Sequence, residues 1–323
     1  MVFWAYLEFR IWDFVFSMII GIDIGGTNIK GVLLASTRRG GIKVIAKNKI
    51  FTKSKTNKKI IIGRIFECIE ALTDRAGGRV DKIGIGVAGP LDSKREKVFP
   101  PNVTGLKNTY LARIVQQKFK TKAVLENDVN CLVLAEAVLG AAKNKKMVVG
   151  LGLGTGVGGG IVFDKRIFHG VDGSAGEIGH MIIACPDFIR GDNGRLCSCG
   201  SKGCLEVYTN EKGIRKSAKE VFGKEIDSIT LHKMAKEGNE RAIKVWQITG
   251  RYLGIGLANL VNILNPDILI IGGGIAGAGK FLLEPAIKEM KRNILSPLAK
   301  DTKVTGAKLG EYAGAIGAGL LHF

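Results

Sequence analysis

One pattern of apolar residues and glycines occurs twice in this chain. Residues 21–34 read GIDIGGTNIKGVLL, and residues 150–163 read GLGLGTGVGGGIVF. Each copy has an apolar, strand-like segment, a glycine-rich turn and a second apolar segment. In the first copy Gly25 and Gly26 can adopt positive φ, which would let backbone N–H groups face a phosphate with no Cβ in the way. The repeat predicts a duplicated architecture with one phosphate-binding hairpin in each half.

Two glycine segments also satisfy the G-x-G-x-x-G pattern of dinucleotide sites. In GTGVGG (154–159) an apolar, β-branched run follows the glycines instead of a helix, which indicates a hairpin. In GGGIAG (272–277) a strand precedes the glycines and a helix follows. The ribose-binding acid about twenty residues later is missing, however, because that region reads KRNILSP. We therefore favour a loop that lets a nucleotide base or ribose approach the backbone over an NAD site.

Composition and charge limit the number of domains and the kinds of partner to be expected. A chain of 323 residues that is 46% hydrophobic can bury the core of two domains or of one large domain. Its net charge of +19 would suit a nucleic acid or another polyanion. Much of this charge lies in residues 43–59, KVIAKNKIFTKSKTNKK, where Phe51 is the only aromatic residue available for stacking on a base. We interpret this segment as a solvated face and expect no nucleic-acid partner.

The first seventeen residues, MVFWAYLEFRIWDFVFS, differ in character from the rest of the chain. They lack the basic start and the cleavage site of a signal peptide, and Glu8, Arg10 and Asp13 interrupt any apolar span. We interpret Met18, placed directly before the first strand, as the natural start and residues 1–17 as a misassigned extension; an accessory amphipathic segment is the alternative. Without a targeting signal we expect a cytoplasmic protein with reduced thiols and no membrane partner.

Cys197, Cys199 and Cys204 lie within eight positions of one another. An odd number of cysteines is poorly suited to disulfides, whereas thiolates at such short spacing converge on one metal ion if a fourth ligand is present. Cys68 and Cys131 occur in apolar helical patterns and are interpreted as core residues.

Two further segments carry polar residues next to apolar elements. KAVLENDVNCLVLAEAVLGAA (122–142) predicts a strand followed by Asn127 and Asp128 at the start of an apolar helix. On this pattern alone, a helix-capping role for Asp128 is favoured over a catalytic one. GSAGEIGHM places Glu177 and His180 close together.

Taken in order, the motifs DIGGTN, GVAGP, PN..GL, ENDVN, LGTGVGGG, GEIGH, CSCGSKGCLE and NPDILIIGGG resemble the ROK family of sugar kinases and sugar-responsive repressors. The resemblance covers Met18 to Phe323. It implies an actin-like, hexokinase-like α/β fold, in which two domains of ribonuclease-H type enclose a central cleft. The domains implied are a small one over residues 18–126, with the helix at 311–323 packing back onto it, and a large one over residues 127–310 that carries the cysteine segment.

The resemblance also implies an ATP-dependent hexose kinase. The aspartate at the position of Asp128 lies beside the attacking sugar hydroxyl, and the one at Asp23 helps to place Mg²⁺, through water. Because phosphoryl transfer is loose, a carboxylate near its ordinary pKa is an adequate base, so capping and catalysis are compatible at Asp128. The residues implied to border ATP are Gly25, Gly26, Thr27, Thr155, Gly156, Gly273 and Gly274.

Sugar binding is implied for Asn102, Asn127, Asp128, Glu177, His180 and Glu206. The family also places His180 as the fourth ligand of a structural zinc ion, together with Cys197, Cys199 and Cys204. One imidazole nitrogen would bind the metal and the other would donate to a sugar hydroxyl. The segment between His180 and Cys197 looks longer than is usual for the family and contains Cys185. Two interpretations are open: Cys185 is an alternative ligand, or the loop reshapes the sugar pocket.

Several alternatives remain open at this level. Glucose is the leading substrate, followed by N-acetylmannosamine or N-acetylglucosamine and by fructose; ADP or polyphosphate could replace ATP as the donor. A repressor would need a helix-turn-helix domain before DIGGT, where only a short aromatic segment is present, and would tend to have degraded phosphate hairpins. A kinase is therefore favoured. The resemblance also implies a homodimer.

Overall fold

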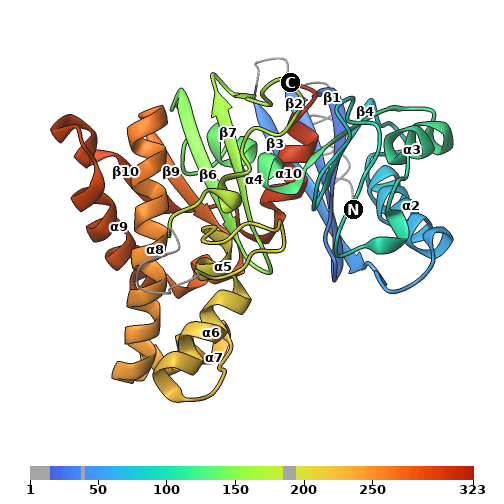
Figure 1. The fold of residues 1–323 in the computed structure, drawn as a ribbon. Coiled ribbons are helices and arrows are strands. Elements are labelled where there is room, and N and C mark those ends of the chain that lie inside the picture. The colour runs from blue at the N-terminus through green and yellow to red at the C-terminus, as the bar shows by residue number, and fades with distance from the viewer. Residues whose placement is uncertain (1–14, 38–40, 185–193) are drawn as a thin grey trace. The chain divides into compact units, whose positions relative to one another are not determined.

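The computed structural model describes residues 15–37, 41–184 and 194–323, which form two compact units. The first unit comprises the chain up to Ala135 together with Leu309–Phe323, and the second comprises Glu136–Lys308. Each unit contains one five-stranded mixed sheet with helices packed against it (Figure 1). The predicted α/β class is confirmed.

The sheet of the first unit has the strand order β3-β2-β1-β4-β5. Its strands are β1 (Val15–Ile24), β2 (Asn28–Thr37), β3 (Ile42–Phe51), β4 (Lys82–Val87) and β5 (Lys122–Asn127). β1 pairs antiparallel with β2 and parallel with β4, and β4 pairs parallel with β5. The carboxyl ends of β1, β4 and β5 therefore meet at one edge of the sheet.

Helices cover both faces of this sheet. Ile22 and its cross-strand partner Gly31 face α2 (Lys58–Arg75), since a Cβ on Gly31 would lie 2.6 Å from Leu72 Cδ1. Because side chains alternate along a strand, the neighbouring position Gly21 faces the other way, toward α10 (Ala313–Leu320). The helices α3 (Leu111–Phe119) and α4 (Asp128–Val138) complete the unit. The last turn of α4, from Glu136, already belongs to the second unit.

The second unit repeats this topology with the order β10-β9-β6-β7-β8. The strands are β6 (Met147–Leu153), β7 (Val157–Phe163), β8 (Arg166–Ile167), β9 (Ile268–Gly272) and β10 (Lys303–Gly306). β6 and β7 form the second antiparallel hairpin, and β6 pairs parallel with β9, as β1 does with β4. The duplication predicted from the two glycine hairpins is confirmed.

The helices of the second unit enclose its core around Trp246, which is 1% exposed. They are α5 (Glu206–Thr209), α6 (Glu211–Phe222), α7 (Ser228–Lys236), α8 (Glu240–Leu264) and α9 (Lys280–Asn293). α8 and α9 pack closely, and Gly250 and Gly254 of α8 leave space for the turn of α9 around Pro285 and Ala286. α8 ends at Leu264, two residues before Pro266, which lacks the backbone N–H needed to continue a helix.

The first strand begins upstream of the position predicted from the sequence. Met18 was expected to precede the first strand, but β1 begins at Val15 and Met18 lies inside it, 3% exposed. The apolar character of residues 15–24 continues upstream of Met18, so the strand does too. Residues 1–14 of the predicted extension lie outside the described residues. Among the helices described, none is long and apolar enough to cross a membrane.

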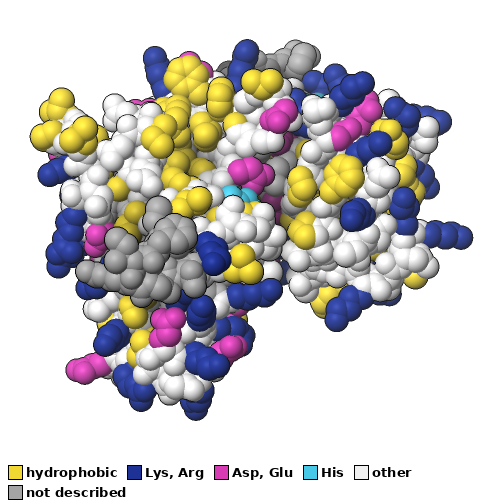
Figure 2. Space-filling view, in the orientation of Figure 1, with side chains coloured by type: hydrophobic (Ala, Val, Ile, Leu, Met, Phe, Trp, Pro, Cys, Tyr) yellow, Lys and Arg dark blue, Asp and Glu magenta, His cyan; other side chains and the backbone are white. Residues whose placement is uncertain are grey.

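The lysines of the basic segment lie on an edge strand. Lys43, Lys47 and Lys49 of β3 are exposed, and β3 pairs only with β2 in the sheet. Charged residues on an edge strand hinder its pairing with another chain. Arg75 Nη1 of α2 donates to Lys47 O at 3.1 Å and Arg64 Nε to Phe51 O at 3.1 Å, so α2 also binds backbone carbonyls of β3. In Figure 2, the Lys and Arg side chains are spread over the visible face and interspersed with acidic ones.

The contact of α10 with β1 and β4 predicts a strong dependence on one glycine. A Cβ on Gly84 of β4 would lie 1.8 Å from Ala318 O, so the helix and the strand cannot both keep their positions in Gly84→Ala. We expect this variant to lose about 3 kcal/mol of stability or more in urea unfolding, because backbone atoms cannot rotate aside. The control is Gly63→Ala at an exposed position of α2, where no atom lies within 4 Å of an added Cβ. This variant should gain up to about 1 kcal/mol of stability. Equal stability of the two variants would contradict this packing.

Candidate functional site

The first hairpin turn is closed by backbone and side-chain hydrogen bonds. Gly25 N–H donates to Asn28 O at 3.0 Å, and Thr52 Oγ1 donates to Gly25 O at 2.7 Å. The prediction that Gly25 and Gly26 adopt positive φ is wrong. Glycine is favoured at position 26 for a different reason: a Cβ there would lie 3.2 Å from Asn102 Cβ. The turn thus packs directly against the loop that carries Asn102.

The second hairpin turn is held by Glu206. Val157 N–H donates to Glu206 Oε2 at 2.9 Å, and a Cβ on Gly156 would lie 2.8 Å from the same oxygen. Thr155 at the tip is exposed. This turn lies at the carboxyl end of β6, beside the loop after β9, because β6 and β9 are parallel.

The loop after β9 contains the two glycines predicted to border the adenosine. Gly273 has φ +86°, and a Cβ on it would lie 2.1 Å from Leu153 O at the end of β6. Gly274 faces open space and begins the short 3₁₀ helix Gly274–Ala278. The structure therefore brings Thr155, Gly156, Gly273 and Gly274 to one end of one sheet.

Asp128 is the first residue of α4, but Asn127 makes the main capping contacts. Asn127 Oδ1 accepts from Val129 N–H at 2.8 Å and from Asn130 N–H at 3.2 Å. Asp128 Oδ1 also accepts from Val129 N–H, at 3.0 Å, and the residue as a whole is half-buried. Asp128 was expected to be the helix cap, but Asn127 makes most of the capping contacts at the N-terminus of α4. This leaves carboxylate oxygen of Asp128 available for other contacts.

Asp23 lies at the carboxyl end of β1, close enough to Asp128 to feel its charge. Burial, and next the negative charge of Asp128, raise the pKa of Asp23 to about 7, although Lys30 acts in the opposite direction. Part of this burial comes from α10, because a Cβ on Gly314 would lie 2.9 Å from Asp23 Cγ. Burial also raises the pKa of Asp128, against the backbone N–H of Val129, which lowers it. Two neighbouring carboxylates in such a site favour a cation between or beside them.

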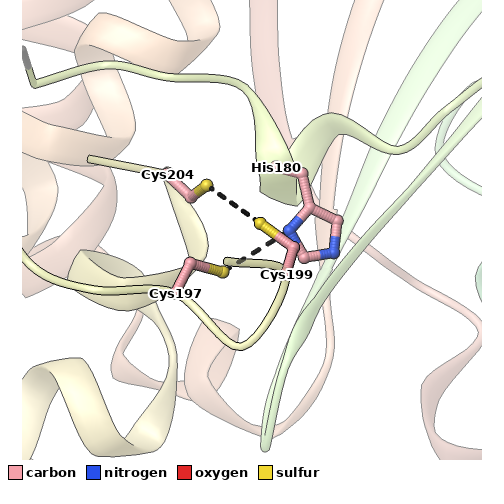
Figure 3. Close-up of side chains that lie close together, drawn as sticks. All are labelled: His180, Cys197, Cys199 and Cys204. Atoms are coloured by element: carbon pink, nitrogen blue, oxygen red, sulfur yellow. Dashed lines mark hydrogen bonds between the residues drawn. The ribbon is translucent and has the colours of Figure 1, made fainter. Parts of the chain in front are cut away.

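Four potential metal ligands converge in the second unit. Cys197 Sγ lies 3.5 Å from His180 Nδ1, and Cys199 Sγ lies 3.7 Å from Cys204 Sγ (Figure 3). The ligand atoms of all four residues lie within 4.8 Å of one another. A tetrahedral zinc ion with Zn–S bonds of about 2.3 Å separates its ligand atoms by roughly 3.5 to 4 Å. The four side chains therefore fit one tetrahedral ion without rearrangement of the backbone.

The thiols of this cluster differ in environment. Cys199 is exposed, and the backbone N–H of Ser201 lowers its pKa to about 6. Cys197 is 4% exposed and Cys204 is fully buried. Burial, followed by its contacts with the other two thiols, raises the pKa of Cys204 to about 12. A bound cation would favour the thiolate form of these sulfurs.

The other predicted residues of the second unit lie around this cluster. His180 belongs to the 3₁₀ turn Ile178–His180, and its N–H donates to Glu177 O at 3.1 Å. Glu206 Oε1 lies 3.9 Å from Cys197 Sγ, so one carboxylate contacts both the second hairpin and the cluster. Cys185, the alternative ligand, lies outside the described residues.

Sequence reasoning missed two charged residues next to these groups. Glu126 is 3% exposed and accepts from Asn130 Nδ2 at 3.0 Å and from Arg95 Nη1 at 3.4 Å. The ENDVN motif contained Glu126, but nothing in the pattern assigned it a partner. The second missed residue is Arg195, whose contacts lie 12 to 25 positions further along the chain.

The two mixed sheets, each built on a glycine-turn hairpin, define a protein of the actin-like ATPase fold. This is the fold of a solved ROK family glucokinase from Streptomyces griseus in complex with glucose and AMPPNP. The two structures align with a TM-score of 0.77 and 29% sequence identity, over 94% of this chain and 99% of that one.

A model of the ROK family matches residues 19–322, so the chain belongs to the ROK family, and the resemblance stated from its motifs is confirmed. It is 31% identical to a glucokinase from Thermotoga maritima over 93% of this chain and 95% of that protein. It is also 33% identical to a xylose repressor from Bacillus spizizenii, over 92% of this chain and 75% of the repressor.

The raised pKa of Asp23 predicts a stability effect that depends on pH. A carboxyl whose folded pKa is raised stabilises the fold fully below its unfolded pKa of 3.8 and loses this contribution as pH rises through about 7. In buffer without Mg²⁺, Asp23→Asn should therefore have a Tm at least about 2 °C above wild type at pH 8, and this gain should disappear toward pH 4. Differential scanning calorimetry measures both.

The control is Asp227→Asn, at a helix cap where hydrogen bonds from the Thr230 backbone and side chain lower the pKa. It should show no gain at pH 8. A Tm difference for Asp23→Asn that is the same at both pH values would contradict the raised pKa.

Proposed function

We propose that this protein is an ATP-dependent hexose kinase, with glucose as the expected acceptor. The observation that carries the proposal is the carboxylate of Asp128 at the start of α4, with Asn127 capping the helix and Asp23 nearby. The glucokinase relative from Thermotoga maritima and the Streptomyces griseus structure with glucose and AMPPNP support the acceptor and the donor.

Asp128 is proposed to orient the attacking sugar hydroxyl and to accept its proton. In a loose phosphoryl-transfer transition state the proton leaves late, so positioning contributes more than base strength. The N-terminus of α4 favours the ionised form of the carboxylate, whereas its burial opposes ionisation. The sugar hydroxyl would donate its hydrogen bond directly to a carboxylate oxygen of Asp128.

Asp23 is proposed to help hold Mg²⁺, through water, which would neutralise charge on the transferred phosphoryl group. The carboxylate fits this role because a nearby cation would lower a pKa that burial and Asp128 have raised to about 7. Gly25, Gly26 and Thr27 would contact ATP phosphates from the first hairpin, and Thr155 and Gly156 from the second. Gly273 and Gly274 would border the adenosine.

The cluster of His180, Cys197, Cys199 and Cys204 is proposed to bind one structural zinc ion. Nδ1 of His180 lies 3.5 Å from Cys197 Sγ and would bind the metal. This leaves Nε2 of the same ring to donate to a sugar hydroxyl. The metal would thereby fix both the tautomer and the direction of the imidazole ring.

The sugar is proposed to bind through Asn102, Asn127, Asp128, Glu177, His180 and Glu206. The contacts of Asn127 limit what it can offer, since its Oδ1 caps α4 and its Nδ2 donates to Gly89 O at 3.3 Å. It retains one N–H for a sugar hydroxyl. Glu206 Oε2 accepts from Val157 N–H, and Oε1, which lies 3.9 Å from Cys197 Sγ, is the oxygen proposed to accept from a sugar hydroxyl.

A sugar-responsive regulator is the second candidate, and the 33% identity to a xylose repressor favours it. Such a protein binds a sugar without phosphorylating it, so a coupled assay separates the two functions. Glucose, N-acetylglucosamine, N-acetylmannosamine and fructose would each be tested with ATP, ADP and polyphosphate. Turnover with glucose and ATP is the expected result; sugar binding without turnover on any donor would favour the regulator.

Asp128→Asn tests the proposed base. The amide keeps the size of the side chain but cannot accept the proton, so kcat for glucose should fall at least ~10²-fold while glucose still binds. Steady-state kinetics and calorimetric titration with glucose measure the two quantities. The control is Asp74→Asn on the exposed end of α2, which should keep the wild-type kcat. Wild-type kcat in Asp128→Asn would remove this residue from the mechanism.

Cys199→Ser tests whether the metal orients His180 or only stabilises a loop. Loss of the metal frees the imidazole, so the sugar KM should rise at least ~10-fold, while the ATP KM changes little because the glycine turns do not depend on the cluster. Elemental analysis should find about one zinc per chain in the wild type and less in the variant. The control, Cys68→Ala, removes a buried thiol of α2 and should retain zinc. A zinc-free protein with wild-type sugar KM would contradict the role of His180.

A further inference from the structure

Arg195 precedes the first cysteine of the cluster by two residues, and its side chain is only 10% exposed. Its guanidinium extends away from the thiols into the junction between α5 and α6. Nη1 donates to Val207 O at 3.3 Å and to Gly213 O at 3.0 Å. Nη2 donates to Ser217 Oγ at 3.1 Å and to Glu220 Oε1 at 2.9 Å. One side chain thus joins the cysteine segment to both helices.

Aromatic stacking reinforces this contact. The guanidinium lies over the Tyr208 ring at 4.8 Å from its centroid, and Tyr208 stacks on Tyr252 of α8 at 4.1 Å with an interplanar angle of 27°. The backbone N–H of Arg195 also donates to Tyr208 Oη at 3.2 Å. The cysteine segment is therefore connected through Arg195 and two stacked rings to the longest helix of the second unit.

Backbone hydrogen bonds carry this connection to the ligands themselves. Gly203 N–H donates to Arg195 O at 3.0 Å, and Gly203 O accepts from Ile183 N–H at 2.9 Å. Leu205 N–H donates to Met181 O at 2.9 Å. The stretches next to Cys197, Cys204 and His180 form one hydrogen-bonded network that includes Arg195.

The same arginine binds the element that carries Glu206. α5 has only four residues, and Arg195 contacts two of them, through Val207 O and the Tyr208 ring. Glu206 in turn accepts from Val157 N–H of the second hairpin. A shift of Arg195 would therefore displace a cysteine ligand and a proposed sugar ligand together.

We propose that Arg195 is a positioning residue that holds the cysteine segment in its metal-binding arrangement before the metal binds, and fixes Glu206 with it. This proposal rests on the proposed zinc and sugar sites only for its consequences, since the contacts of Arg195 are all with protein atoms. Lysine cannot replace it, because an ammonium group lacks the planar array of donors and the stacking surface that serve four acceptors and a ring at once.

The direct test is thiol accessibility in metal-free protein. In wild type treated with a chelator, N-ethylmaleimide should modify exposed Cys199 rapidly and buried Cys197 slowly. In Arg195→Lys the modification of Cys197 should be at least ~10-fold faster, by the same reasoning that gives a supporting residue a 10- to 100-fold effect at a metal site. Peptide mapping by mass spectrometry assigns the modified thiol. Equal protection of Cys197 in both proteins would overturn the proposal.

The matched control is Arg241→Lys. Arg241 also stacks on a ring, that of Phe222 at 4.6 Å, and donates to a backbone carbonyl, Val221 O, without contacting the cysteine segment. It should leave the protection of Cys197 unchanged. Faster modification in both variants would show a general loosening of the unit and would also overturn the proposal.

Zinc affinity and kinetics separate this proposal from the proposed function. Competition with a chromophoric chelator should show at least ~10-fold weaker zinc binding in Arg195→Lys, with a raised sugar KM and an unchanged ATP KM. If wild type binds no zinc, the zinc site fails, whereas the thiol experiment on Arg195 still decides the present proposal. Wild-type zinc affinity and sugar KM in Arg195→Lys would overturn it.

Discussion

The contact of α10 with β1 and β4 is made by backbone atoms, and the chemistry of the first unit depends on it. Gly21 of β1 and Gly84 of β4 let the helix approach so closely that a Cβ at either would lie within 2 Å of a carbonyl oxygen of α10, and a Cβ on Gly317 of α10 would lie 1.7 Å from Cys131 O of α4. The start of the helix thereby reaches Asp23, since Gly314 lies against its carboxyl group. The closeness of the packing is thus one cause of the burial that raises the pKa of Asp23, so a structural contact sets the charge of a proposed magnesium ligand.

Much of the fold could be predicted because its strands and turns are local patterns. The repeated hairpin predicted the duplication, and the β-branched run after GTGVGG correctly excluded a dinucleotide helix at β7. The predicted positive φ at Gly25 and Gly26 was wrong. At Gly26, glycine is favoured instead by the close approach of Asn102, a residue that is distant in sequence. A pattern of residues shows that a glycine is needed but not which of these two reasons applies.

The candidate site was predicted where its residues lie in short motifs and missed where its contacts are long-range. His180 and the three cysteines were proposed from sequence, and their ligand atoms do converge. Asp128 was interpreted correctly as part of a helix start, but only the structure shows that Asn127 makes the main capping contacts. Arg195 could not be found in the sequence, because its partners on α5 and α6 have no fixed spacing from it and any of the many arginines could have filled the role.

The division of the chain at residues 135 and 308 also affects the order in which the protein folds during synthesis. The second unit is continuous, so all of its residues are translated before α10. The first unit begins earlier but cannot cover the Gly21 and Gly84 face of its sheet until residues 309–323 emerge. Domains generally fold as units as they are synthesised. The nascent chain therefore carries a first unit whose sheet stays uncovered on one face until α10 has been made.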